Sequence, residues 1–294
     1  MCNSKIYDQV NEKIISLLEQ GVNPWRKPWR TGKIEVARNF VSKKAYRGCN
    51  FFITNSMGYT SPLWGTFNQI KAKGGNVRKG EKGTIIIFWK TFDIKEKQEN
   101  GDLKNKTIPL LKYSYIFNAE QCENLNLTEE TPVELKEHCP IEACENVKAN
   151  FPLGMPELRH NNERAFYSPS LDYISLPERG LYDKIEEYYH TFFHESIHAT
   201  GHKSRLNRDT LTGCSYFGDT CYSQEELVAE MGASYLSAFT GIDNATIDNS
   251  AAYLSGWLAA LRKDKTMLLK ASSQAQKAVD YLLKTKFNEE ITDE

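Results

Sequence analysis

Two histidines one helical turn apart, with a glutamate beside them, are the residues of this sequence best suited to chemistry. They lie in the segment His194-Glu195-Ser196-Ile197-His198. Positions four apart share one face of a helix, so both imidazoles can bind one zinc ion. Glu195 is then able to act as general base on a water molecule. The spacing therefore predicts the site of a zinc-dependent hydrolase.

Hydrolytic zinc sites usually take three protein ligands and keep a fourth position for water, so a third ligand must come from elsewhere. We predict Glu226, within the run from Glu225 to Glu230, and keep His202 as the alternative. Glu230 is expected to accept a hydrogen bond from the second nitrogen of a metal-bound histidine. Tyr222, one turn before Glu226, is a candidate donor to a developing oxyanion.

Both groups of ligands lie in segments with helical periodicity. Residues 182–193 contain no Pro or Gly, and Gly201 is predicted to end this helix in a left-handed conformation. A second helix is predicted from Gln224 to Phe239 with Ser223 as N-cap. A capping box between Ser223 and Glu226 is the alternative interpretation of that glutamate, and it needs no metal.

His190, His194, His198 and His202 recur every four residues. A step of four drifts by about 40° per turn on a helix of about 3.6 residues per turn, so four imidazoles cannot reach one ion. We therefore expect His190 to be a packed or partly exposed histidine and not a ligand. The strand expected at Asp172 to Leu176 could form the cleft edge on which a peptide substrate lies extended, or it could be purely structural.

Basic residues are concentrated in the first half of the chain, although the net charge of the 294 residues is only −1. Residues 1–127 contain 21 Lys/Arg against 11 Asp/Glu, a balance of +10, whereas residues 128–294 contain 16 against 27, a balance of −11. This asymmetry predicts two domains, with the basic one facing a polyanion. We place a basic domain at 1–127, an acidic linker at 128–150 and the metal-site domain at 151–294.

Aromatic residues are interleaved with these cations, and Trp64 and Trp89 add to them. Such a pattern suits single-stranded nucleic acid, because bases stack on rings at about 1–3 kcal/mol per base while cations neutralise the phosphates. Indoles that anchor the core and a merely solvated basic surface are the alternatives. The predicted DNA contacts are Trp25, Arg26, Lys27, Trp29, Arg38, Tyr46, Arg47, Arg78, Lys79 and Lys82.

The remaining patterns predict an α+β fold. They comprise a helix at 4–20, a short helix with Thr66 as N-cap, a hairpin of strands at 84–89 and 112–117 with a polar tip at 93–107, and two helices within 250–286. The metal-site half is expected to be mainly helical with a short sheet.

The composition indicates a cytoplasmic protein without a membrane anchor. No apolar run approaches the roughly 20 residues that a membrane span needs, and the first residues lack the apolar core of a secretion signal. Seven cysteines without a C-x-x-C pair fit a reducing compartment. Cys139 and Cys144 with His138 could form a second metal site, but ordinary thiols are the preferred interpretation.

Over nearly its whole length the chain resembles the ArdC-type antirestriction proteins of conjugative plasmids. The matching phrases are residues 24–29, 46–50, 74–83, 194–206, 225–230 and 272–282. The resemblance implies an N-terminal single-stranded-DNA-binding domain, also found fused to plasmid primases, and a C-terminal zincin-like metallopeptidase domain. It implies protection of incoming DNA from host restriction. A protein substrate is unidentified, and a DNA-binding protein whose zinc domain is structural or inactive is the alternative.

Overall fold

The computed structural model describes residues 2–19, 36–97, 103–127, 140–160, 164–212, 220–242, 257–259 and 261–285. Four predicted DNA contacts, Trp25, Arg26, Lys27 and Trp29, lie outside these ranges.

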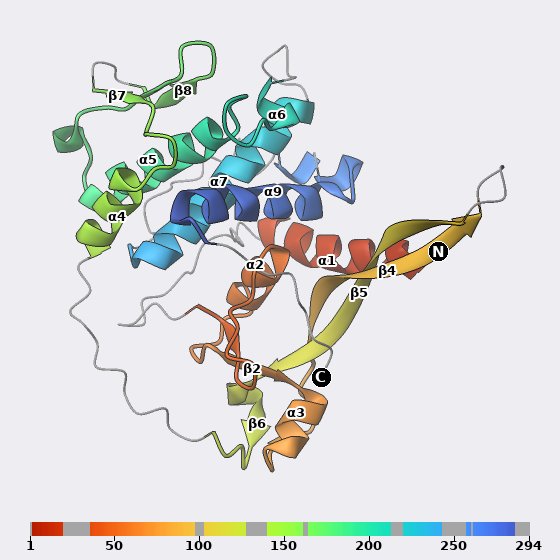
Figure 1. The fold of residues 1–294 in the computed structure, drawn as a ribbon. Helices are drawn as coiled ribbons and strands as arrows, with labels where there is room; N and C mark the ends of the chain where they lie inside the picture. Colours follow the sequence, from red (N-terminus) through yellow and green to blue (C-terminus); the bar gives the residue numbers. More distant parts are fainter. Residues whose placement is uncertain are drawn as a thin grey trace.

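The first half of the chain is built on a four-stranded sheet of order β1-β2-β5-β4 (Figure 1). Strand β1 is parallel to β2, and the other neighbours are antiparallel. The elements of this half are α1 (Cys2–Glu19), β1 (Arg38–Asn39), α2 (Cys49–Asn55), β2 (Leu63–Thr66), α3 (Phe67–Ala72), β3 (Asn76–Val77), β4 (Thr84–Lys97), β5 (Leu103–Asn118), η1 (Ala119–Gln121) and β6 (Cys122–Glu123).

In this half the predicted N-cap at Thr66 is correct, whereas the predicted hairpin tip at 93–107 is too long. The N-cap is confirmed, because Thr66 accepts a hydrogen bond from the Gln69 N–H in a capping box. The hairpin tip at 93–107 is wrong, since β4 continues to Lys97 and β5 begins at Leu103. In Figure 1 the two strands project away from the rest of the sheet as a ribbon. The polar composition of residues 93–107 indicates a loop, but the backbone of these residues pairs as far as Lys97 opposite Leu103.

The second half packs helices against one another and against a small sheet of order β7-β9-β8. The predicted fold class, α+β with a mainly helical second half, is confirmed. The elements are α4 (Pro140–Ala149), β7 (Glu157–Arg159), β8 (Phe166–Ser168), β9 (Tyr173–Ser175), η2 (Arg179–Leu181), α5 (Ile185–Thr200), α6 (Asp209–Thr212), α7 (Thr220–Thr240) and α9 (Met267–Leu283).

Part of the segment expected to be a linker belongs to this helical half. Helix α4 occupies Pro140–Ala149, and its Cys144 and Val147 are buried in the main core. Glu145 accepts hydrogen bonds of 2.6 Å from Arg179 and Tyr189. The Glu-rich composition concealed these two apolar positions, three apart on one helical face.

The two halves share one hydrophobic core despite their opposite charge. Phe51 and Phe52 of α2 pack on Tyr235 of α7, with ring centroids 4.5 and 4.9 Å apart. The side chain of Asn11 in α1 donates to the carbonyl of Leu261 at 2.9 Å. Among the described helices, none is long and apolar enough to cross a membrane.

Candidate metal centre

The centre lies where α5 crosses α7, and a glycine allows the two helices to approach closely. A Cβ atom added at Gly232 of α7 would lie 2.6 Å from two carbon atoms of Ile197 in α5. That distance is shorter than any normal carbon contact, so only glycine fits. The close crossing brings one turn of α7 opposite the histidines of α5.

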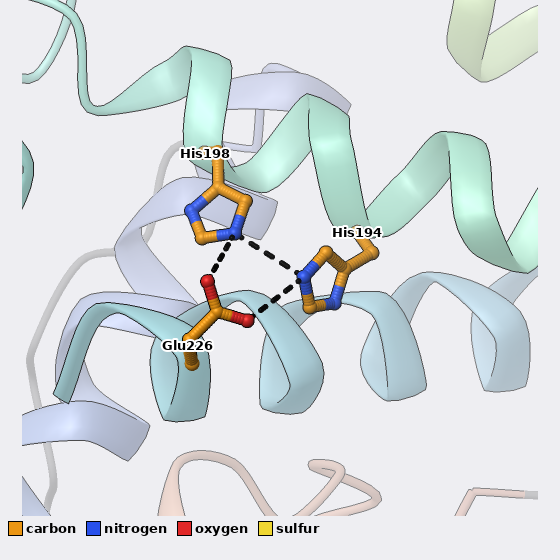
Figure 2. A group of neighbouring side chains, drawn as sticks. All are labelled: His194, His198 and Glu226. Carbon is orange, nitrogen blue, oxygen red and sulfur yellow. Dashed lines mark hydrogen bonds and ion pairs between the residues drawn. The ribbon is translucent and has the colours of Figure 1, made fainter. Parts of the chain in front are cut away.

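Figure 2 shows His194 and His198 on α5 pointing toward Glu226 on α7. The Nε2 atoms of the two histidines are 3.2 Å apart. Oε2 of Glu226 lies 3.5 Å from Nε2 of His194, and Oε1 of Glu226 lies 3.5 Å from Nε2 of His198. The predicted ligands therefore meet at one point.

Four atoms of this cluster, two imidazole nitrogens and both oxygens of Glu226, are spaced closely enough to hold one zinc ion. Bonds of about 2.0–2.1 Å in a tetrahedron separate neighbouring ligand atoms by roughly 3.3 Å. The two nitrogens are 3.2 Å apart, and each has a different Glu226 oxygen 3.5 Å away, which is close to that separation. Two imidazoles and a carboxylate are also the donor set of many catalytic zinc sites.

Carboxylates make the cluster a favourable place for positive charge. Burial lowers the pKa of His198, but hydrogen bonds to Glu225 and Glu226 outweigh it and raise the pKa to about 9. The pKa of His194 is raised well above its usual 6.5 in the same way, by Glu226 and Glu230 against burial. A divalent cation can replace the protons that these carboxylates hold on the imidazoles.

Glu195 is buried beside the histidines and has a different environment from the other carboxylates. Burial raises its pKa above the usual 4.5, which the neighbouring histidines only partly offset. Its carboxylate accepts a hydrogen bond from the backbone N–H of Tyr167 in β8. A raised pKa suits a group that must take and return a proton near neutral pH.

The residues that hold His198 in place were not predicted from the sequence. Its Nδ1 lies 3.1 Å from Oε1 of Glu225, whose carboxylate also accepts hydrogen bonds from Arg208 at 2.9 and 2.5 Å. Thr210 donates a further hydrogen bond to Glu225. All four side chains are buried. Glu225 was visible only as a neighbour of Glu226, and nothing local to Arg208 signals this pairing.

Arg208 also explains Gly201, which we expected to be left-handed. Gly201 has φ −75°, so that prediction is wrong. A Cβ there would lie 2.8 Å from the Arg208 guanidinium, which donates to the carbonyl of Ile197 at 2.8 Å and to the hydroxyl of Thr200 at 2.9 Å. The glycine therefore makes room for the arginine that satisfies the end of α5.

Among the remaining residues of the prediction, Glu230 contacts a histidine of this cluster, whereas the two other histidines have serine partners. Glu230 has a carboxylate oxygen 3.6 Å from Nδ1 of His194. Tyr222 is half-buried on α7, one turn before Glu226. His202 bonds to Ser204 at 2.7 Å, in the turn after α5. His190 is packed as expected, with Nδ1 2.9 Å from the Ser237 hydroxyl.

Two predictions about neighbouring elements are wrong. Helix α7 begins at Thr220, so Ser223 lies inside it and cannot form the capping box that was the alternative role of Glu226. Strand β9, expected at the cleft edge, pairs on both sides, with β7 and β8. The strand at the edge beside α5 is β8, whose Tyr167 N–H points to Glu195.

The described DNA candidates have varied surroundings. Lys79 and Lys82 are exposed, and Arg78 pairs with Glu81 at 3.1 Å. Nη2 of Arg47 lies 2.6 Å from both carboxylate oxygens of Asp280. Arg38 is half-buried on β1. The hydroxyl of Tyr46 is buried, which raises its pKa to about 12.

The fold and site define a chain with a zincin-like metallopeptidase domain. The profile of the zincin-like metallopeptidase family matches residues 146–274, and that of the N-terminal domain of anti-restriction factor ArdC matches residues 4–117. Crystal structures of antirestriction protein ArdC from the R388 plasmid, metal-free and Mn(II)-bound, are both 35% identical with a TM-score of 0.73. Each covers 95% of this chain, which covers 96% and 97% of theirs.

Curated proteins give the same assignment. Protein y4eC of Sinorhizobium fredii is 34% identical over 94% of this chain and 91% of its own length. DNA primase TraC of Escherichia coli is 35% identical over 94% of this chain, which spans only 27% of the primase. The chain belongs to the ArdC family of antirestriction proteins.

Proposed function

We propose that this protein binds single-stranded DNA through its basic half and cleaves a protein substrate with its zinc domain, protecting incoming DNA in the cytoplasm during conjugation. The observation that carries the peptidase proposal is a buried glutamate, Glu195, beside two imidazoles and a carboxylate spaced for a tetrahedral ion. His194, His198 and Glu226 would hold zinc, which lowers the pKa of water and polarises carbonyls.

The chain's own residues would perform the remaining steps. Glu195 takes a proton from the attacking water and returns it to the departing amine. Glu225 and Glu230 keep the imidazoles oriented. Tyr222 donates a hydrogen bond to the oxyanion. A peptide would lie extended along β8, an edge strand of the sheet β7-β9-β8.

The test compares the wild-type chain with Glu195→Gln on a library of unstructured peptides, read by mass spectrometry. The amide keeps the size of the side chain but cannot accept the proton. Cleavage should disappear while zinc content stays the same. Cleavage that survives the substitution would overturn the role of Glu195.

The second candidate function is that of a DNA-binding protein whose metal site is structural. The burial of Glu225 and Arg208 favours it, because these residues make the metal site continuous with the protein core. A plasmid-transfer assay separates the two. Under the peptidase proposal, Glu195→Gln loses protection. Under the binding alternative, protection survives that change and is lost only when Arg26, Lys27, Arg78 and Lys79 are neutralised.

A further inference from the structure

Two partly exposed tyrosines stand side by side on strand β5, on the face that also carries the buried Leu111. Tyr113 and Tyr115 are 46% and 47% exposed, and their ring centroids are 5.8 Å apart. Residues two apart on a strand point to the same face, so the rings form one surface. Single exposed aromatics are ordinary, but an adjoining pair on a regular strand is a patch that calls for a partner.

Side chains of strand β4 lie beside the tyrosines on the same face of the sheet. Its Ile85 and Ile87 pair with Tyr115 and Tyr113, and Ile87 is buried. At Gly83 an added Cβ would lie 3.0 Å from the Cβ of Tyr115, so the chain that enters β4 runs against the tyrosine. The exposed Lys82 comes immediately before Gly83, which places a cation one residue from the backbone that contacts Tyr115.

A third exposed ring lies across the sheet. Strand β2, on the other side of β5, ends with Thr66 opposite Ile116, so Phe67 follows near the level of Tyr115. Phe67 is 49% exposed, and the ammonium group of Lys71 lies 5.6 Å from its ring centroid. Cations thus accompany aromatic rings on both sides of β5.

Trp64, which we expected to contribute to nucleic-acid binding, does not belong to this surface. Trp64 is 1% exposed and packs with Ala37 and Ile116 in a separate small core. Within the part of the basic half whose side chains are described, the exposed rings are therefore Phe67, Tyr113 and Tyr115.

We propose that Tyr113 and Tyr115 form a platform on which unpaired bases of single-stranded DNA stack, with Lys82 neutralising the adjoining phosphates. The inference rests on the proposed DNA binding and names its surface. Exposed aromatic rings can stack on the bases of a nucleotide strand, and neighbouring cations can bind its phosphates. A duplex hides its base faces, so the strand must be unpaired.

The experiment measures the affinity of the full chain for two fluorescent probes by anisotropy. One is oligothymidylate, and the other has the same backbone with abasic sites. Tyr113→Leu/Tyr115→Leu should bind oligothymidylate at least about fivefold more weakly, since each stacked base contributes about five- to 150-fold. The variant should also lose most of the preference for thymidylate over the abasic strand.

Three controls separate stacking from charge and from general damage. Tyr113→Phe/Tyr115→Phe keeps both rings and should bind like the wild type. Phe239→Leu removes a 55% exposed ring from α7 and should have no effect. Lys82→Gln should lower the salt dependence of binding by roughly one counterion, whereas the leucine variant should leave that slope unchanged.

Each possible result supports or overturns either the tyrosine platform or DNA binding itself. If the wild type binds oligothymidylate and the leucine variant keeps both its affinity and its preference, the platform is wrong while DNA binding stands. If the wild type binds no single strand, both proposals fail. If the leucine variant misfolds, photochemical cross-linking of the wild type to an iododeoxyuridine strand decides. Adducts must map to Tyr113 or Tyr115, and adducts only elsewhere overturn the inference.

Discussion

His198 reaches Glu225 through Nδ1 at 3.1 Å while its Nε2 faces Glu226. Glu225 therefore orients the His198 ring through Nδ1. Glu226 lies beside Nε2, the nitrogen that would bind the proposed metal ion. Arg208 holds Glu225 in turn, so the second half of α5 and the start of α7 are coupled through a buried network.

Replacing Glu225 with Gln should weaken zinc binding by about 10- to 100-fold, because a neutral amide polarises His198 less and turns an N–H toward Arg208. Competition with a chromophoric chelator measures the affinity. Glu142→Gln, which makes the same charge change at an exposed position of α4, is the control. Equal zinc affinity in both variants would contradict the orienting role.

Arg208→Met should lower the free energy of unfolding by about 3–5 kcal/mol, since it leaves Glu225 buried without its charged partner. Urea denaturation of the metal-free protein measures this loss. Arg159→Met breaks the exposed ion pair with Glu157 and should have little effect. A small loss at Arg208 would mean that the buried pair is dispensable for folding.

Gly232→Ala should destabilise the chain by about 1–3 kcal/mol, although alanine is the better helix former, because the added methyl overlaps Ile197. Forcing α7 away from α5 should also weaken zinc binding. Gly180→Ala meets no atom within 4 Å and serves as the control. Unchanged stability and zinc affinity at position 232 would show that the helices can separate without consequence.

The sequence was sufficient for the histidines and for Glu226, because a four-residue repeat on an uninterrupted helix brings two imidazoles to one face. It was insufficient for Arg208. Its partner Glu225 lies seventeen positions away on α7, whereas Arg208 precedes α6, and only tertiary packing brings the two together. The edge strand was assigned to β9 instead of β8, because three-residue strands carry too little alternation to reveal their order.

The positive charge of the first half does not reveal which of its cations have partners within the chain. Arg47 was predicted from that charge to contact DNA, and in the structure it pairs with Asp280 of α9 and joins the two halves. The exposure of Tyr113 and Tyr115 was not predicted, because Leu111 on the same face of β5 is buried and alternation alone does not separate them.

Arg47→Gln should therefore lower stability modestly, by about 1 kcal/mol for a partly exposed pair, and leave the salt dependence of DNA binding unchanged. Anisotropy titrations of oligothymidylate at several salt concentrations measure the slope. A slope reduced by roughly one would mean that Arg47 leaves Asp280 and contacts a phosphate.

The most direct test of the metal centre is the zinc content of the purified wild type, Glu226→Ala and His202→Ala, measured by mass spectrometry after dialysis against trace zinc. We expect one zinc ion per chain in the wild type and in His202→Ala, and a loss of zinc in Glu226→Ala. Zinc retained without Glu226 but lost without His202 would contradict the site described above.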